Sequence, residues 1–190
     1  MLSVIIATHE SERSLVPTLS ALIPAVSTGL LGEVVVADAG SRDATAQVAD
    51  IAGCRLVVSS ERLGTRLRAA AASTRAPWLM FLRAGTVLEP GWPDVVGPFL
   101  EKAGAIGTPR AAVFRPQPAS DVMRSGLAEA LAVLRASLAA PKPQHGLLLA
   151  RALYNEIGGH EADEEADITL LRRIGRRRLA RLSARATFRS

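Results

Sequence analysis

The chain has 190 residues, which is enough for one domain of ordinary size with a substantial core. Hydrophobic residues make up 48% and aromatic residues only 4%, so that core must be aliphatic. The formal net charge is +5, and the single cysteine, Cys54, excludes an internal disulfide framework and a cysteine-based metal site. One unpaired cysteine fits a reducing, cytoplasmic location.

The N-terminus reads as a first strand. The run "LSVIIAT" at residues 2–8 is β-branched and apolar on both faces, which suits the middle of a parallel sheet. It lacks the basic region of a signal peptide, and glycine and proline interrupt later apolar runs before about 20 residues accumulate. We expect neither a signal peptide nor a membrane span.

Further strands and helices alternate along the first half. A helix is predicted to begin between residues 11 and 14 and to continue to residue 26, with Pro17 tolerable only in its first turn. The later elements are a strand at 33–40, a helix at 41–53, a strand at 54–60, a helix at 65–74, a strand at 77–83 and a short helix at 90–100. This order is typical of a parallel, doubly wound α/β sheet.

The second half is less regular. Its predicted elements are a strand at 105–114, a helix between 120 and 138, a loop at 141–144, a strand at 145–150 and helices at 151–159 and 162–175. The last helix opens with acids and closes with arginines, which matches the helix dipole. No internal repeat or low-complexity linker is visible, so we expect one domain over residues 1–190.

Polar residues gather where the predicted parallel strands end, which is where ligands bind in open sheets. These strand ends are Thr8 to Glu10, Asp38 to Ser41, Ser59 to Glu61 and Arg83 to Gly85. No dinucleotide-binding GxGxxG follows the first strand, and no P-loop or GxSxG elbow is present. The sequence therefore lacks the usual motifs of those three classes.

Four stretches in the right order resemble a known family. "SVIIATHE", "VVVADAGSRDAT", "GTRLRAAAASTRAPWLMFLRAGTVLEPGW" and "HGLLLARALYNEIGGHEADEEADITLLRRIG" are similar to blocks of the family 2 glycosyltransferases. The resemblance covers most of the chain. It implies a single GT-A-like domain, with a Rossmann-like, mostly parallel central sheet flanked by helices. Residues 1–100 would then form the nucleotide-binding half, and residues 101–190 the acceptor-side half with an arginine-rich tail.

The resemblance assigns a nucleotide site to the first two strand ends. Thr8 and Glu10 would line the pocket for the base and ribose. Asp38 matches the first acid of the family's Asp-Asp-Gly-Ser turn, which accepts a hydrogen bond from a uracil-type base. The second acid is replaced by Ala39. Gly40 and Ser41 would shape the tight turn, and the expected donor is a nucleotide-sugar, with UDP favoured.

The resemblance also implies a general base. Glu164 and Glu165 match the family's Glu-Asp pair, whose second acid deprotonates the acceptor hydroxyl. A carboxylate within hydrogen-bond reach of that hydroxyl suits the reaction. The nearby Asp163 and Asp167 are alternatives, and acids at a helix start can also merely cap it.

The family's metal motif is missing. Two acids of an Asp-x-Asp motif usually hold Mg²⁺ or Mn²⁺ against the diphosphate, where this chain has Arg83 and Gly85. Neither side chain offers an oxygen ligand. We therefore assign no metal ligands and name no certain cofactor, and Mg²⁺ or Mn²⁺ stays an open alternative without the usual acidic motif. Arg62 and Arg66, close in sequence, are further candidates for contacting the diphosphate.

Three interpretations of Arg83 stay open. It can replace the cation, because a guanidinium binds phosphate bidentately. Alternatively, nucleotide binding persists without turnover. In the third interpretation Arg83 only extends its charge toward solvent or pairs with an acid such as Glu61 or Glu89, and the fold serves as a scaffold. The alternative to an enzyme is a non-catalytic relative that binds a nucleotide, a lipid phosphate or a protein. The acceptor stays unknown.

The C-terminal segment is strongly basic. Eight arginines and no acid follow position 171. Such a segment can contact an anionic membrane surface, which would place the protein at the inner membrane face, or it can be a solvated face. No nucleic-acid motif is recognisable, so nucleic acid is not an expected partner.

Overall fold

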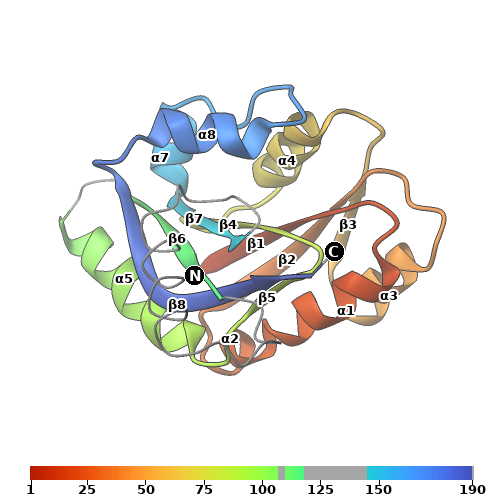
Figure 1. Ribbon diagram of the computed structural model, residues 1–190, viewed down its shortest axis with the longest axis horizontal. Coiled ribbons are helices and arrows are strands. Elements are labelled where there is room, and N and C mark those ends of the chain that lie inside the picture. The colour runs from red at the N-terminus through yellow and green to blue at the C-terminus, as the bar shows by residue number, and fades with distance from the viewer. Residues whose placement is uncertain (107–109, 118–144, 190) are drawn as a thin grey trace, which may run out of the picture.

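The computed structural model describes residues 1–106, 110–117 and 145–189, and shows one sheet between two layers of helices (Figure 1). The strands are β1 (Leu2–Thr8), β2 (Leu31–Asp38), β3 (Arg55–Val58), β4 (Trp78–Arg83), β5 (Thr86–Leu88), β6 (Ala111–Pro116), β7 (Leu147–Ala150) and β8 (Leu179–Phe188). The helices are α1 (Glu12–Ser20), α2 (Ile23–Ser27), α3 (Thr45–Ile51), α4 (Leu63–Ala72), α5 (Trp92–Ile106), α7 (Arg151–Glu156) and α8 (Ala166–Ile174).

Among the described residues the strand order is β3-β2-β1-β4-β7-β6-β8-β5. Strands β1 to β4 are parallel to one another, whereas β7 runs antiparallel to both β4 and β6. Strand β8 is parallel to β6, and the short β5 pairs antiparallel with β8. This confirms the expected α/β fold with a mostly parallel central sheet flanked by helices.

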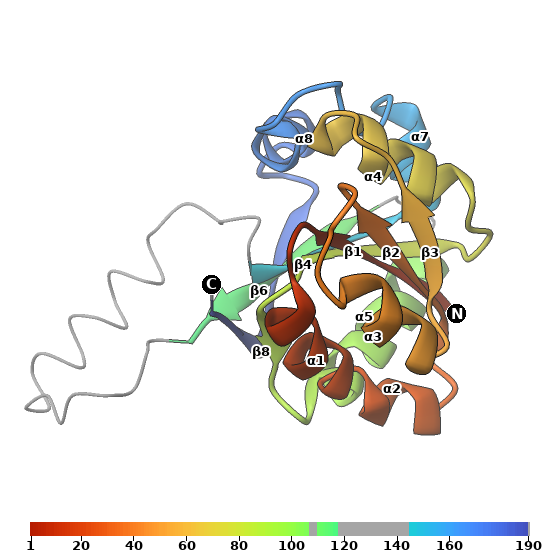
Figure 2. The ribbon, with the colours of Figure 1, turned by 90° about the vertical axis from the view of Figure 1, so that its right-hand side faces the viewer.

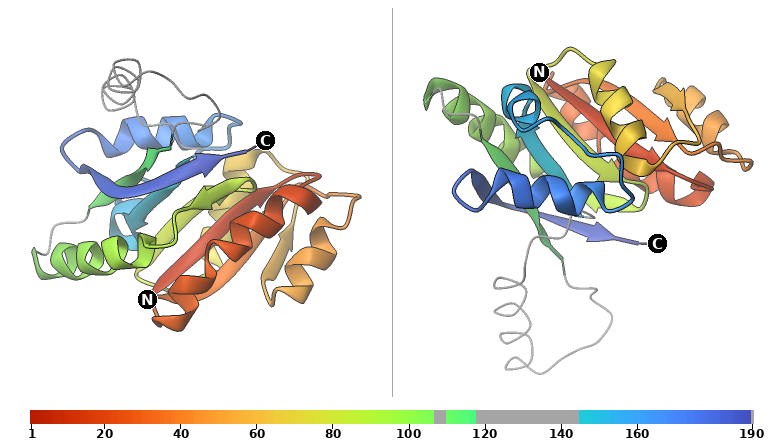
Figure 3. Two further views of the ribbon diagram at one scale, coloured as in Figure 1. Left: turned by 60° about the horizontal axis from the view of Figure 1, so that its bottom comes forward. Right: turned by 90° about the horizontal axis from the view of Figure 1, so that it is seen from above.

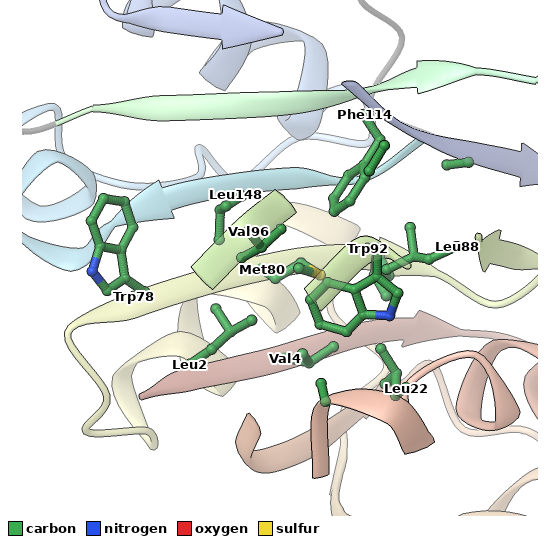
Figure 4. Close-up of a cluster of buried hydrophobic side chains, with 14 of the residues drawn as sticks. Leu2, Val4, Leu22, Trp78, Met80, Leu88, Trp92, Val96, Phe114 and Leu148 are labelled. Carbon is green, nitrogen blue, oxygen red and sulfur yellow. The ribbon is translucent and has the colours of Figure 1, made fainter. Parts of the chain in front are cut away.

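The two faces of the sheet are buried by different helices. Alternate residues of β1 and β4, such as Val4 and Met80, pack with Trp92 and Val96 of α5 on one face (Figure 4). Helices α4, α7 and α8 cover the other face (Figure 2), and the intervening residues along the strands, such as Leu79 and Phe81, pack against these helices. Because side chains alternate along a strand, Arg83 projects from the same face as Phe81.

The first predicted helix is divided in two. Helix α1 ends at Ser20, and α2 begins at Ile23. Pro24 lacks the N–H that would bond to the carbonyl of Ser20, so a continuous helix would lose a hydrogen bond there. Pro17 lies beyond the first turn of α1, and the prediction that it must lie within that turn was wrong.

The arginine-rich segment contains a sheet strand. Strand β8 is the last long strand of the chain (Figure 3), and in it the exposed Arg181, Ser183 and Arg185 alternate with buried residues that pack into the core. Strand β5, which the sequence analysis did not predict, exists by pairing with β8. The helix predicted between residues 120 and 138 and the loop at 141–144 lie outside the described residues. In the part of the chain that the structure covers, no helix has the length and apolarity of a bilayer span.

Candidate functional site

The ends of β1 and β2 are joined through the Asp38 carboxylate. Its Oδ1 accepts hydrogen bonds from Thr8 Oγ1 at 2.7 Å and Ser41 Oγ at 2.6 Å. Its Oδ2 accepts from the backbone N–H groups of Gly40 at 2.8 Å and Ser41 at 2.7 Å. Burial by itself would raise the pKa of Asp38, but the hydrogen bonds from Ser41, Thr8 and Gly40 outweigh it and lower that pKa. Both oxygens are therefore occupied in shaping the turn.

Glu10 connects the same two loops from the other side. Its backbone N–H donates to Ser41 Oγ at 2.8 Å, and its Oε1 accepts from the N–H of Arg42 at 2.8 Å. The φ angle of Glu10 is 48°, a left-handed conformation that costs a non-glycine residue free energy. The structure thus brings Thr8, Glu10, Asp38, Gly40 and Ser41 together, as a polar ledge at the ends of β1 and β2.

A hollow of about 520 Å³ opens next to this ledge, and its lining includes Glu10, Asp43, Gly85 and Arg189. Its size lies in the range of small-molecule sites. It does not include Arg83, Glu164 or Glu165. We therefore locate the candidate site by the strand ends and their polar contacts rather than by this hollow alone.

Arg83, at the end of β4, forms an ion pair with Asp167 on α8. Arg83 Nη2 and Nε lie 2.9 and 3.2 Å from Asp167 Oδ2. The side chain of Arg83 is 39% exposed and that of Asp167 only 7%. The partner is thus neither Glu61 nor Glu89. The Nη1 edge of the guanidinium is not engaged by Asp167.

Burial alone would raise the pKa of Asp167. The hydrogen bond from His160 and the charge of Arg83 outweigh this effect and hold the pKa below its usual value. A buried carboxylate with a lowered pKa and two occupied oxygens is poorly suited to take a proton from an acceptor hydroxyl. Asp167 is therefore a poorer general base than its exposed neighbours.

Glu164 and Glu165 are exposed at the start of α8, where Glu165 is the N-cap residue without a side-chain capping bond. They precede Asp167 by three and two positions. Both are exposed whereas Asp167 is buried, and the described hydrogen bonds of the ion pair include neither of them.

The turn after β4 has no room for a second acid. Gly85 has a φ of +95°, and a Cβ added there would lie 2.0 Å from the carbonyl oxygen of Arg189. Its N–H donates to the carbonyl of Ser14 at 3.0 Å and to Thr18 Oγ1 at 2.9 Å. With Arg83 already paired to an acid, the residues of this turn do not fit a divalent cation. Nor do the described residues contain a group of three His, Cys, Asp or Glu side chains placed to hold a metal ion.

The other predicted arginines differ in exposure. Arg62 is exposed at the N-cap of α4. Arg66 is 9% exposed, donates from Nη1 to the carbonyl of Glu61 at 2.8 Å, and leaves a buried Nε without a partner. The N-terminus of α4 packs against the loop before α8, since the Gly64 N–H donates to the carbonyl of Asp163 at 3.0 Å.

Comparison with known proteins decides the family. The model for the family described as "Glycosyl transferase family 2" matches residues 3–126, which is more than half of the chain. The chain belongs to glycosyl transferase family 2. No curated protein matches this glycosyltransferase at a significant level.

Solved structures of glucosyl-3-phosphoglycerate synthase from Mycobacterium tuberculosis share the fold of this glycosyltransferase. The complex with phosphoglyceric acid is 21% identical with a TM-score of 0.73, and the match covers 100% of this chain and 71% of that chain. The complex with Mn²⁺, UDP and phosphoglyceric acid is 19% identical with a TM-score of 0.72, and the match covers 100% of this chain and 71% of that chain. The complex with Mn²⁺ and UDP-glucose is 22% identical with a TM-score of 0.71, and the match covers 100% of this chain and 70% of that chain.

The sequence analysis missed the surroundings of Asp167. Besides pairing with Arg83, Asp167 lies 3.1 Å from His160 Nε2, and His160 Nδ1 lies 3.0 Å from the hydroxyl of Tyr154. Tyr154 is the only tyrosine of the glycosyltransferase, and in an aromatic-poor chain that rarity was an available signal. Among the described residues His160 is not placed to bind a metal ion, because its Nε2 contacts Asp167 Oδ1 and its Nδ1 contacts the Tyr154 hydroxyl.

Proposed function

We propose that this family 2 glycosyltransferase transfers a sugar, with inversion, from a nucleoside diphosphate donor of the UDP type to an acceptor hydroxyl. The first half of the chain would bind the donor and the second half the acceptor. In support, the polar ledge of Thr8, Glu10, Gly40 and Ser41, held in shape by Asp38, stands at the strand ends where α/β sheets bind ligands. The structurally similar synthase binds UDP and UDP-glucose.

Arg83 would take the position that a divalent cation occupies in most of the family. The supporting observation is the Nη1 edge of a partly exposed guanidinium at the end of β4, which bonds to no other residue that the structure describes. Positive charge at that point stabilises the leaving diphosphate, and a guanidinium can do this with directed hydrogen bonds. Arg62 and Arg66, at the start of α4, would add positive charge beside the loop that precedes α8.

Glu165, with Glu164 beside it, would act as the general base. Both are exposed just before Asp167 in the chain, so an incoming hydroxyl can approach them from solvent. Asp167 cannot easily share this task because its oxygens accept from Arg83 and His160. Proton removal by a positioned carboxylate contributes about 10²–10⁴-fold to such reactions.

Calorimetric titration with UDP, with and without Mn²⁺, tests the proposal. We expect UDP to bind without metal, and we expect Arg83→Ala to abolish this binding. Arg83→Lys should only weaken it, because lysine keeps the positive charge but cannot bind phosphate bidentately. The matched control is Arg75→Ala, an exposed arginine at the far end of β4. Failure of UDP and GDP to bind under any condition would favour the non-catalytic alternative.

With a UDP-sugar donor, Glu165→Gln should abolish turnover while UDP binding persists.

We also propose a cytoplasmic location with peripheral contact to an anionic membrane. The exposed Arg176, Arg177 and Arg185 supply positive charge, and each basic residue near such a surface contributes about 1 kcal/mol. Because β8 is part of the sheet, truncation would unfold the protein, so the test is charge removal. Vesicles containing phosphatidylserine should bind the wild type more strongly than the triple glutamine variant, and equal binding would exclude this contact.

A further inference from the structure

A continuous line of polar contacts leads from the half-exposed Arg83 into the apolar core. Phe81 and Arg83 project from the same face of β4, and Tyr154, His160 and Asp167 approach them from α7, the following loop and α8. The exposed fraction of the side chain falls from 39% at Arg83 to 7% at Asp167 and 0% at His160. A fully buried imidazole beside a candidate site needs a physical reason, because burying polar groups is costly unless every one is paired.

All contacts of His160 are satisfied by one neutral tautomer. Its backbone N–H donates to the Tyr154 hydroxyl oxygen at 3.2 Å, and the hydroxyl can in turn donate its proton to Nδ1 at 3.0 Å. With Nδ1 accepting, the ring proton sits on Nε2 and donates to Asp167 Oδ1 at 3.1 Å. The neutral imidazole then satisfies both nitrogens, and Asp167 accepts from His160 with one oxygen and from Arg83 with the other.

The ring of His160 is also held by packing. It stands edge-on to Phe81, with centroids 4.6 Å apart and an interplanar angle of 79°. Phe81 in turn stacks on Tyr154 at 5.4 Å. This aromatic group lies in the same apolar cluster as Leu153 and Leu170. His160 therefore cannot turn away from Asp167 without opening the core.

The backbone around His160 is fixed as well. Gly159 has a φ of +66°, and a Cβ there would lie 2.8 Å from Tyr154 Cζ, so the loop lies directly against the tyrosine ring. Arg68 Nε donates to the carbonyl of His160 at 2.8 Å, and Arg173 Nη1 donates to the carbonyl of Gly159 at 3.1 Å. Arg68 and Arg173 thus hold the loop that carries His160, and His160 and Arg83 bond to the same carboxylate, that of Asp167.

We propose that Tyr154 and His160 are positioning residues, which fix the Asp167 carboxylate so that Arg83 presents its Nη1 edge to the diphosphate of the donor. The consequence for ligand binding rests on the proposed function. A free arginine side chain samples many rotamers, and ordering it on binding lowers affinity. Prior ordering by Asp167 removes that cost. Outer partners of this kind typically change affinity or activity by about 10–100-fold when removed.

The test uses Tyr154→Phe, His160→Leu and His160→Gln in the full chain. Tyr154→Phe removes only the hydroxyl, whereas His160→Leu removes the donor to Asp167, and His160→Gln restores an N–H donor of similar reach. Ile174→Val is the matched control, because it alters the same apolar cluster without touching the polar line. If His160→Leu fails to fold, Tyr154→Phe and His160→Gln carry the test.

The first readout does not depend on any ligand. In ¹⁵N NMR, the wild type should show His160 with its proton on Nε2 and a protected Arg83 Nε–H signal, assigned by its absence in Arg83→Lys. Both features should be lost in His160→Leu and weakened in Tyr154→Phe, but kept in Ile174→Val. Failure of the proposed function would appear as no UDP binding by the wild type with this NMR pattern intact.

The second readout is UDP affinity without metal. We expect at least about tenfold weaker binding in His160→Leu, a smaller loss in Tyr154→Phe, and partial recovery in His160→Gln. Variants that match Ile174→Val in both the Arg83 signal and UDP affinity would overturn the inference. Unchanged affinity in a variant that has lost the Arg83 signal would overturn it too.

Discussion

At the scale of single residues, the backbone decides which side chains the candidate site can hold. Gly85 occupies a left-handed conformation beneath the carbonyl of Arg189, so the second acid of the family's metal motif has no place there. Asp38, in contrast, is retained at a position where its carboxylate shapes the turn. The loss of one acid and the retention of the other therefore have separate physical reasons.

Restoring the acid at position 85 should not restore a metal site. We expect Gly85→Asp to lower the free energy of unfolding by about 1–3 kcal/mol or more, because both the positive φ and the contact with Arg189 oppose it. Urea unfolding measures this loss, and calorimetry should detect no gain in Mn²⁺ affinity. Gly91→Asp is the control, since a Cβ at Gly91 meets no atom within 4 Å. Equal stability of the two variants would contradict the prediction.

At the scale of elements, the site depends on contacts between α4 and the loop that precedes α8. A Cβ at Gly64 would lie 1.6 Å from the carbonyl oxygen of Glu161, so only glycine permits this approach. The same loop holds His160 and leads to Glu164 and Glu165. Displacing it would move the proposed base and the positioning residues together.

Gly64→Ala should therefore destabilise the protein although alanine is the better helix former. We expect a loss of about 1–3 kcal/mol, as for overpacked sites, and weaker UDP binding. Gly97→Ala in α5 meets no atom within 4 Å and should stabilise the protein by about 0.5–1 kcal/mol. Thermal unfolding of both variants gives the comparison. A stabilised Gly64→Ala protein would show that this contact is not close in solution.

Much of this element level could be predicted from sequence, and the failures have physical causes. The strands at residues 2–8 and 77–83 are apolar runs whose pattern is local. The pairing of Arg83 with Asp167 spans 84 positions, and four acids lie between 163 and 167, so only the phase of α8 decides which one turns inward. Exposed and buried residues alternate along β8, but its buried positions are partly alanine and its exposed ones partly arginine. The segment therefore resembles a solvated one in sequence.

At the scale of the whole molecule, two buried carboxylates tie stability to pH. Counted over the whole residue, Asp38 is 2% exposed and Asp167 is 5% exposed, and the pKa of each is lowered in the folded state. A lowered folded pKa stabilises the native state above the unfolded pKa of about 3.9. That contribution is lost as the pH falls through the folded pKa.

Acid should therefore destabilise the protein below about pH 4, and part of this effect should belong to these two residues. Urea unfolding at pH 7 and pH 3 should show a smaller difference in Asp38→Asn and Asp167→Asn than in the wild type. Both variants should also be less stable at pH 7, because asparagine accepts with only one oxygen. Asp50→Asn, at an exposed position, is the control. An unchanged pH dependence in both buried-site variants would refute this assignment.

The place of β8 in the sheet has a consequence for synthesis on the ribosome. Strands β1 to β4 can pair with one another early, but β5 and one side of β6 find their partner only in β8. During translation the edges of β5 and β6 stay unpaired until residues 179–188 emerge, and such edges invite association with other chains. The nascent chain should thus depend on chaperones most strongly in the interval between completing β6 and releasing β8.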